Sequence, residues 1–256
     1  MIRVVKLGGR VQDDAALGPA VERAIRASAL VIVHGGGDQV SALQRQLGRE
    51  PRFVGGRRVT SSEDIDIVRM GLSGIANKRL VSTLAAALVR AVGISGEDGG
   101  LLSAVIAPGA PLGRVGERVQ ANVALLHDLL SHGWTPVVSP VGRDREGARG
   151  EALNVNGDDA ATAIAVALRA DELLFLADVS GVLVDGEPLA SITPDDAHAL
   201  IERGVAAGGM AAKLDAARVA LAHGVARIRI TDLRGLDEPT RGTSLLSATA
   251  VSPWRP

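Results

Sequence analysis

The chain has 256 residues, which is enough for one large α/β domain or two small ones with a sizeable core. Hydrophobic residues make up 46 %, charged residues 22 %, and the formal net charge is −1; these values are ordinary for a globular protein and argue against a basic face for nucleic acid. Aromatic residues make up 2 %, which argues against a base-stacking platform, and the lack of cysteine excludes disulfides, thiolate metal sites and a cysteine nucleophile.

The sequence shows no targeting or membrane segment. It begins with a strand-like run and lacks the basic, apolar and small-residue layout of a signal peptide. The Ala/Leu/Val stretches are interrupted by Arg, Asp or His before they reach the length of a membrane span. We therefore expect a cytoplasmic protein with neither a nucleic acid nor a membrane as partner.

Apolar runs with strand character alternate along the chain with segments of helical periodicity. We expect strands at 2–6, 29–33, 91–94, 101–106, 135–140, 172–177, 226–231 and 243–247. We expect helices at 15–26, 38–47, 63–73, 76–89, 123–131, 158–168, 195–203 and 210–223. Such βαβ alternation is typical of a three-layer α/β fold, in which an open, mainly parallel central sheet lies between helices.

The segments that connect these elements are rich in glycine, proline or charge. Residues 51–60 are expected to form a hairpin or loop, and 108–119 a hairpin. Residues 178–186 turn back through Asp-Gly, which predicts another hairpin. The charged, glycine-rich stretch 142–150 is expected to be a flexible loop and the boundary between two lobes. The tail after residue 252 is expected to fray.

The first expected strand ends in Lys6-Leu7-Gly8-Gly9, a lysine followed by a glycine turn. Glycines let backbone N–H groups approach an anion closely, and Lys6 adds a full positive charge beside them. The turn therefore suits a phosphate, although strand–glycine turns are common and a lysine at a strand end is often only solvated.

Further glycine-rich turns occur at 35–37, 93–100 and 208–209. Ligands of open α/β sheets bind beyond the carboxyl ends of the strands, where such turns gather, but each turn alone is equally explained by a tight connection. Neither the Gly-x-x-x-x-Gly-Lys-Ser/Thr phosphate loop nor Gly-x-Gly-x-x-Gly after the first strand is present. His34, which precedes one of these turns, lacks a triad context and is interpreted as structural.

The turn Gly208-Gly209 opens a helix that carries Met210 and Lys213 in its first turn. The free N–H groups and the dipole of a helix N-terminus attract anions, and Lys213 brings a point charge to the same place. A lysine in this position opposes the dipole, which favours a functional role over a side chain that only reaches solvent.

Two clusters of polar residues are further candidates. Asn154, Asn156 and Asp158 precede an Ala-rich helix, where they fit caps and turns, but Asp158 could equally hold lysine ammonium groups or bind a metal-bearing nucleotide. Arg57 and Arg58 lie in a glycine-flanked loop, where they either clamp a substrate carboxylate or are surface charges.

Taken in order, these motifs resemble those of the amino-acid kinase family, and most closely its branch that phosphorylates N-acetyl-L-glutamate. The matching segments, which span nearly the whole chain, are 5–9, 33–37, 53–60, 93–99, 154–158, 177–182 and 208–213. The resemblance implies an amino-acid kinase-like fold. It also implies transfer of the γ-phosphoryl group of ATP, with Mg²⁺ on its phosphates, to the side-chain carboxylate of N-acetyl-L-glutamate in arginine biosynthesis.

The resemblance further implies a role for each matching residue. Lys6 and Lys213 would stabilise negative charge on the transferring phosphoryl group, and Asp158 would orient both lysines. Gly9 and Gly36 would donate backbone N–H groups to the same oxygens. No metal site of the protein's own is implied, and no general base is needed, because a carboxylate is already an anionic nucleophile.

The resemblance divides the single domain over 1–256 into an acyl-amino-acid-binding lobe of about 1–145 and an ATP-binding lobe of about 146–256. The residues implied for the acetylglutamate pocket are Gly36, Gly37, Arg58 and Asn154. Those implied for ATP are Gly8, Gly9, Asp178, Val179, Ser180, Gly181, Val182, Leu183, Gly208, Gly209 and Met210.

Two features depart from the family pattern. Arg57 stands where the family usually has leucine, and it is expected to add a charge at the substrate side. Arginine-inhibited members resemble one another in an N-terminal helix that builds a hexamer, whereas here the first strand begins at Ile2. We therefore expect an arginine-insensitive homodimer.

Two alternatives remain open at the level of sequence. The first is a kinase for carrier-protein-linked or N-acylated aminoadipate or glutamate in lysine biosynthesis, which would need a basic surface for an acidic carrier; Arg52 and Arg57 fit this. The second is a non-catalytic amino-acid or nucleotide sensor on the same fold. A sensor would be expected to lose a charged partner, yet Lys6, Lys213 and Asp158 are all present.

Overall fold

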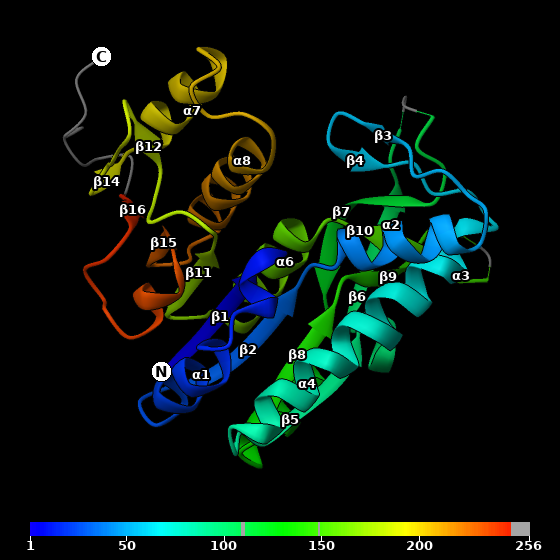
Figure 1. Cartoon of the computed structure of the whole chain (residues 1–256), viewed down its shortest axis with the longest axis horizontal. Coiled ribbons are helices and arrows are strands. Elements are labelled where there is room, and N and C mark those ends of the chain that lie inside the picture. The colour runs from blue at the N-terminus through cyan, green and yellow to red at the C-terminus, as the bar shows by residue number, and fades with distance from the viewer. Residues whose placement is uncertain (109–110, 148, 247–256) are drawn as a thin grey trace.

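The structure, a computed structural model of the chain, describes residues 1–108, 111–147 and 149–246. It has the predicted three-layer α/β fold, with a mostly parallel central sheet between helices (Figure 1). The tail that was expected to fray, and the last residue of the strand expected at 243–247, lie outside the described residues. No described helix combines the length and hydropathy needed to cross a bilayer.

Eight strands form the central sheet, and all neighbouring pairs are parallel except β15 with β16. In spatial order they are β14 (Ser191–Ile192), β16 (Thr243–Leu245), β15 (Ile228–Thr231), β11 (Glu172–Leu176), β1 (Ile2–Leu7), β2 (Ala29–His34), β8 (Thr135–Ser139) and β5 (Ala91–Ser95). All eight expected strands occur; seven belong to this sheet, and the two-residue edge strand β14 was not predicted.

Alternate side chains of the strands point to opposite faces of the sheet and build two cores. Val4 and Phe175 contribute to one core, and Val5 and Leu174 to the other. The helices over the first core are α5 (Ala124–Ser131), α6 (Gly157–Leu168), α7 (Pro194–Glu202) and α8 (Gly208–Ala222). Those over the second are α1 (Leu17–Ile25) and α4 (Asn77–Ala86).

A small closed barrel stands beside one end of the sheet, next to α2 (Gly37–Gln46) (Figure 1). Its strands are β6 (Leu102–Ile106), β7 (Val115–Ala121), β9 (Val141–Asp144) and β10 (Ala152–Val155). The hairpin predicted within 108–119 is present but longer than predicted, because its first strand is β6, which pairs antiparallel with β7. The expected loop at 142–150 is shorter than predicted, because its first residues belong to β9, which pairs with β10.

Two short hairpins occur as predicted, β3 (Phe53–Val54) with β4 (Arg57–Arg58) and β12 (Leu183–Val184) with β13 (Glu187–Pro188). The two helices expected at 63–73 and 76–89 are instead continuous. A π-helical segment, Met70–Ala76, joins α3 (Asp64–Arg69) to α4. Its glycines, Gly71 and Gly74, have no positive φ and do not end the helix; Gly71 allows close packing, since a Cβ there would lie 2.7 Å from Val40 Cγ2 of α2.

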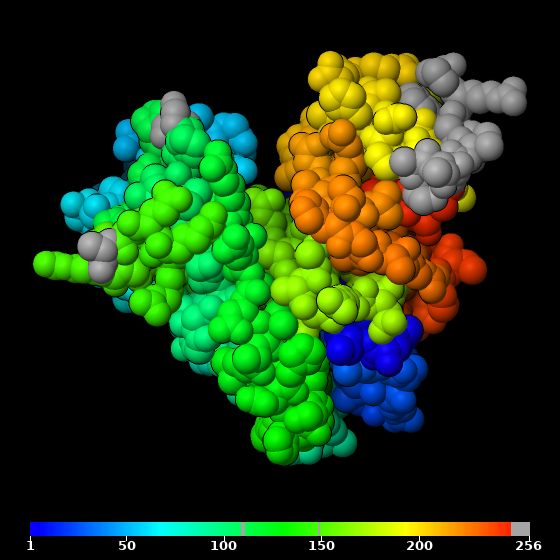
Figure 2. Space-filling model, turned by 180° about the vertical axis from the view of Figure 1, so that it is seen from behind, coloured from blue at the N-terminus to red at the C-terminus, as the bar shows by residue number. Residues whose placement is uncertain are grey.

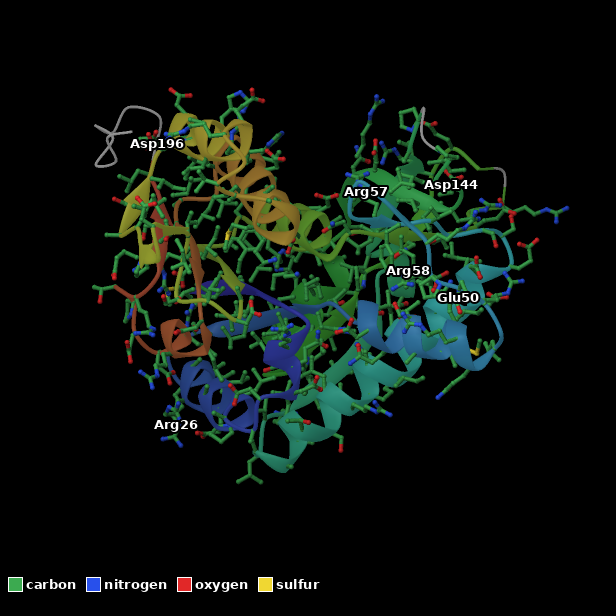
Figure 3. All side chains as sticks on the ribbon, turned by 45° about the horizontal axis from the view of Figure 1, so that its top comes forward. Arg26, Glu50, Arg57, Arg58, Asp144 and Asp196 are labelled. Atoms are coloured by element: carbon green, nitrogen blue, oxygen red, sulfur yellow. The ribbon has the colours of Figure 1, made fainter. Side chains whose placement is uncertain are left out.

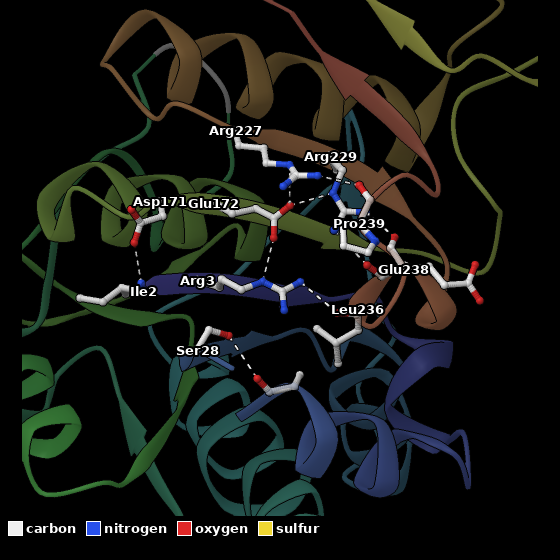
Figure 4. Close-up of polar contacts among 12 residues, drawn as sticks. Ile2, Arg3, Ser28, Asp171, Glu172, Arg227, Arg229, Leu236, Glu238 and Pro239 are labelled. Carbon is white, nitrogen blue, oxygen red and sulfur yellow. Dashed lines mark hydrogen bonds and ion pairs between the residues drawn. The ribbon is translucent and has the colours of Figure 1, made fainter. Parts of the chain in front are cut away.

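A buried ion cluster lies at the amino ends of three sheet strands, away from the glycine turns (Figure 4). Glu172 accepts hydrogen bonds from Arg3 Nε and Arg229 Nε, each at 2.7 Å, and Arg229 is 1 % exposed. Burial pushes the pKa of Glu172 upward, but the hydrogen bond and charge of Arg229 and the charge of Arg3 more than offset this, so that the pKa is lowered. The ionised carboxylate of Glu172 on β11 therefore connects β1 and β15 through Arg3 and Arg229.

Candidate active site

The candidate site lies at the carboxyl end of β1, where the order of the strands changes direction. From β1 the chain adds β2, β8 and β5 on one side of the sheet and β11, β15 and β16 on the other. The crevice at such a switch point is the usual ligand site of an open α/β sheet. Lys6, Gly8 and Gly9 are at this end of β1, and the first turn of α6 brings Asp158 to it.

Lys6 and Lys213 converge on the carboxylate of Asp158, as the sequence predicts. Lys6 Nζ lies 2.8 Å from Asp158 Oδ1, and Lys213 Nζ lies 3.7 Å from Oδ2. The side chains are only 10 %, 12 % and 6 % exposed for Lys6, Lys213 and Asp158 respectively. Two cations therefore share one anion at the base of the crevice, which leaves a net positive charge for an anionic ligand.

The titration of Lys213 is displaced by this environment. Burial lowers its pKa, and the positive charge of Lys6 lowers it further, while Asp158 partly offsets both effects. Lys213 therefore loses its proton at a lower pH than an ordinary lysine does. The carboxylates of Asp158 and, more weakly, Asp178 therefore favour the charged form of Lys213.

Local backbone structure fixes Asp158 and Lys6. Asn156 caps α6 and accepts the N–H of Asp158 at 2.7 Å, which sets the start of the helix. Gly157, the first residue of α6, packs on Lys6; a Cβ there would lie 3.3 Å from Lys6 Cε. Gly157 was not among the predicted site residues, although it stands between Asn156 and Asp158 in the same motif.

The glycines of the site differ in what they can offer a ligand. The N–H of Gly8 donates to the carbonyl of Leu176 on β11 at 2.9 Å, so Gly8 permits close packing and its amide is already used. The N–H of Gly9 has no partner among the described residues, and open space surrounds its Cα. Gly36 has φ +153°, and a Cβ there would lie 2.8 Å from Leu72 Cδ2 of the π-helical segment, so only glycine fits.

Arg58 is buried against the N-terminus of α2. Its guanidinium donates to Gln44 Oε1, to the carbonyl of Gly37 at 2.7 Å and to Ser41 Oγ at 2.8 Å. The same group lies 4.7 Å from the centre of the Phe53 ring, and burial lowers its pKa. A guanidinium placed at a helix N-terminus makes a strongly positive corner, which suits a carboxylate.

Asn154 connects this corner to the barrel. Its Nδ2 donates to Thr60 Oγ1 at 3.0 Å, and Thr60 Oγ1 donates in turn to the carbonyl of Arg58 at 3.1 Å. Arg58, Thr60 and Asn154 are thus one hydrogen-bonded group, of which Thr60 was not predicted as a site residue. The other two members, Arg58 and Asn154, were predicted as site residues from the sequence motifs.

Arg57 points away from Arg58, and the two arginines do not form a joint clamp (Figure 3). Neighbouring strand residues face opposite sides. Arg57 Nη1 forms an ion pair with Glu117 on β7, and its Nη2 lies 3.8 Å from Asp159 Oδ2 on α6. The expected free charge at the substrate side is therefore corrected, because two carboxylates neutralise it.

His34 was predicted to be structural, and its surroundings are consistent with that interpretation. It is fully buried, and its Nε2 lies 3.1 Å from Asn77 Nδ2. Burial lowers its pKa to about 4, with smaller contributions from the positive charges of Lys78 and Lys6, while its contact with Gly35 opposes the shift. The imidazole is therefore neutral near pH 7.

The segments expected to hold ATP follow β11 and begin α8, the helix that carries Lys213. Residues 178–183 follow β11; Val182 is buried and its N–H donates to Thr243 Oγ1 at 2.8 Å. Gly208 begins α8 with φ +54°, and no side chain in the described part of the chain caps this helix. The N-terminus of α8 is therefore free to receive an anion beside Lys213. Among the described residues, no group of three or more His, Asp or Glu side chains is placed to hold a metal ion.

Comparison with known proteins gives consistent results. The profile of the amino acid kinase family matches residues 1–232. The acetylglutamate kinase of Methanopyrus kandleri is 44 % identical over 94 % of this chain and 99 % of its own length. That of Roseiflexus castenholzii is 41 % identical over 97 % of this chain and 95 % of its own length. Among solved structures, a Streptococcus mutans protein superposes with a TM-score of 0.84 at 29 % identity, covering 95 % of this chain and 98 % of its own.

Proposed function

The chain belongs to the amino acid kinase family, and we infer that it transfers the γ-phosphoryl group of ATP to the side-chain carboxylate of N-acetyl-L-glutamate. The product is N-acetyl-L-glutamyl 5-phosphate, an acyl phosphate of arginine biosynthesis. The observation that supports this assignment is that Lys6 and Lys213 converge on Asp158. Arg58, at the start of α2, and the start of α8 are the two further positive sites.

The chemistry follows from the charges in the crevice. The attacking oxygen belongs to a carboxylate, so that no base has to remove a proton. Catalysis then depends on aligning two anions and on stabilising the charge that develops between them. Lys6 approaches from the end of β1 and Lys213 from α8, and Asp158 holds both ammonium groups toward the position of the transferring phosphoryl group.

The two substrates are assigned to opposite sides of these three residues. We place the α-carboxylate of N-acetyl-L-glutamate at Arg58, with Gly36, Gly37 and Asn154 around it; the buried, positive corner at the start of α2 supports this. We place ATP against residues 178–183 and the start of α8, where Gly208, Gly209 and Met210 lie. We keep the proposed division into an acceptor-binding lobe of about 1–145 and an ATP-binding lobe of about 146–256, with Asn154 reaching the acceptor side from the second lobe.

Mg²⁺ enters this proposal bound to the phosphates of ATP. Asp158, the only carboxylate at the base of the crevice that the described contacts identify, is already shared by two lysines. A divalent cation there would be repelled by both ammonium groups. The donor set therefore does not fit a metal held by the protein itself, and no step is assigned to one.

The carrier-linked alternative loses one of its two supports. Arg57 was expected to present a positive charge to an acidic carrier, but Glu117 and Asp159 neutralise it. The sensor alternative is not favoured either, because Lys6, Lys213 and Asp158 form an intact group. N-acetyl-L-glutamate as the acceptor requires neither a basic surface for a carrier protein nor the loss of a charged residue from the site.

An acyl-phosphate assay tests the assignment directly. The protein is incubated with Mg-ATP, and the product is trapped with hydroxylamine and measured as the hydroxamate. We expect product with N-acetyl-L-glutamate, much less with N-acetyl-aminoadipate and none with unacetylated glutamate. Equal or greater turnover of N-acetyl-aminoadipate would favour the alternative kinase, and no turnover with any acceptor would favour a sensor.

The proposal also includes the homodimer, the insensitivity to arginine and the cytoplasmic location expected from the sequence. Light scattering coupled to gel filtration tests the first, with a hexamer as the contradicting outcome. Inhibition by arginine in the same hydroxamate assay would contradict the second. Fractionation of the source cells tests the third.

A further inference from the structure

Arg57 stands at the centre of an ion cluster that joins three parts of the fold. Its guanidinium pairs with Glu117 on β7 and lies 3.8 Å from Asp159 on α6, while Arg57 itself belongs to β4. The three side chains are 32 %, 32 % and 36 % exposed, so that the cluster is half-buried. They line one end of a hollow of about 970 Å³ between β7, α6 and α8, on the face seen in Figure 2.

The hairpin that carries Arg57 and Arg58 has little apolar anchoring of its own. Each of its strands has two residues, and Phe53 and Val54 are 55 % and 46 % exposed. A Cβ added at either glycine of its turn would meet nothing within 4 Å. Because the hairpin buries little apolar surface, its polar contacts decide where it lies: those of Arg58 hold it to α2, and those of Arg57 hold it to β7 and α6.

The cluster links the two halves of the active site through adjacent residues. Arg57 precedes Arg58, whose guanidinium forms the carboxylate corner, and Asp159 follows Asp158, which holds the two lysines. The contact between Arg57 and Asp159 therefore connects the two sides of the site: Arg57 is the neighbour of Arg58 on the acceptor side, and Asp159 is the neighbour of Asp158 on the phosphoryl-transfer side.

We propose that Arg57 is a positioning residue, which holds the β3–β4 hairpin against α6 and thereby sets the place of Arg58 relative to Asp158. The inference rests on the proposed function, since it assigns Arg58 to the acceptor. Arg57 does not touch the acceptor itself. Its loss releases the hairpin from α6 and β7, so that only the contacts of Arg58 with α2 among those described above hold it, and this weakens acceptor binding; the lysines and the ATP side stay in place.

The electrostatic contribution of Arg57 can be separated from its positioning role. Without Arg57, Glu117 and Asp159 are left as unpaired anions near the acceptor site, which would by itself repel an anionic acceptor. The triple variant Arg57→Met, Glu117→Gln, Asp159→Asn removes all three charges together. Positioning predicts that the triple variant keeps the defect of Arg57→Met, whereas simple repulsion predicts its repair.

Steady-state kinetics with four proteins test the proposal: wild type, Arg57→Met, the triple variant, and Arg118→Met as a control that removes an exposed arginine next to Glu117. We expect Arg57→Met and the triple variant to raise the KM for N-acetyl-L-glutamate about three- to tenfold, as loss of a half-exposed ion pair allows. The kcat and the KM for ATP should change less than twofold. Arg118→Met should match wild type.

Hydrogen–deuterium exchange of residues 52–60 supplies a readout that does not depend on turnover. We expect faster exchange in Arg57→Met and the triple variant and no change in Arg118→Met. An unchanged KM for the acceptor, repair by the triple variant, or unchanged exchange would each overturn the proposal. If the wild-type protein phosphorylates no acceptor and Arg57→Met still exchanges faster than wild type, the proposed function is wrong but the structural role of Arg57 stands.

Discussion

Replacing Asp158 with Asn removes the carboxylate that Lys6 and Lys213 share and changes little else in shape. At an effective dielectric constant of about 20, the 2.8 Å contact with Lys6 corresponds to about 6 kcal/mol of attraction, and the 3.7 Å contact with Lys213 to about 4.5 kcal/mol. Desolvation opposes most of this, and breaking a buried pair costs about 3–5 kcal/mol. We therefore expect the melting temperature to fall by roughly 6–20 °C.

The same substitution should change the pH dependence of turnover. Activity requires a protonated Lys213, so it falls as the pH rises through the pKa of Lys213. The pKa of Lys213 is already lowered by burial and by Lys6, and Asp158 works against this shift. Without the carboxylate, the pKa falls further, so that the alkaline limb of kcat moves to lower pH. At neutral pH we expect kcat to fall by about 10²- to 10³-fold.

The assay is the hydroxamate measurement between pH 6 and pH 10 with saturating substrates, on Asp158→Asn and on Asp215→Asn. Asp215 is 61 % exposed and pairs with Arg218, so its substitution removes a carboxylate of the same helix that carries Lys213 without disturbing the lysines. An alkaline limb that stays in place or moves to higher pH in Asp158→Asn would show that Asp158 does not raise the pKa of Lys213. A similar shift in Asp215→Asn would show that net charge alone is responsible.

Two further substitutions test other parts of the site and the fold. Arg58→Met should raise the KM for N-acetyl-L-glutamate at least about tenfold with little change in the KM for ATP, because a charge-assisted carboxylate contact is lost; initial rates at varied acceptor and ATP measure both. Glu172→Gln should lower the free energy of unfolding by about 3–5 kcal/mol, since it strands Arg3 and Arg229, and leave kcat per folded molecule unchanged. The pKa of Glu172 is lowered in the folded state, so the carboxylate stabilises the folded protein above the unfolded pKa of about 4.3. This stabilisation is lost as the pH falls through the folded pKa. Urea titrations should therefore show the largest difference in unfolding free energy between wild type and Glu172→Gln at pH 7, and a smaller one at pH 3.

The fold was predictable to the extent that its elements are local. Apolar runs that alternate with helical periodicity gave the strands and helices of the central sheet, because each pattern is written within a few residues. The closed barrel was not foreseen, because β6 pairs with both β7 and β9, and β9 lies some way along the chain. The helical continuity through Met70–Ala76 also escaped prediction, since glycines there accompany a π turn that periodicity does not describe.

The candidate site shows the same limit at the level of single residues. Lys6, Asp158 and Lys213 each lie in a motif, and the structure brings them within contact distance. Arg57 lies in a motif as well, but its partner Glu117 is 60 residues away and belongs to no motif. Sequence could therefore flag the extra charge, but it could not show that the charge is neutralised.

The central claim is that Lys6 binds most strongly as charge develops in phosphoryl transfer from ATP to N-acetyl-L-glutamate. The most direct test is the hydroxamate assay on Lys6→Ala, with kcat and the KM of both substrates measured separately. We expect kcat to fall by at least about 100-fold while both KM values stay within about threefold of wild type. A large rise in KM with an unchanged kcat would contradict it.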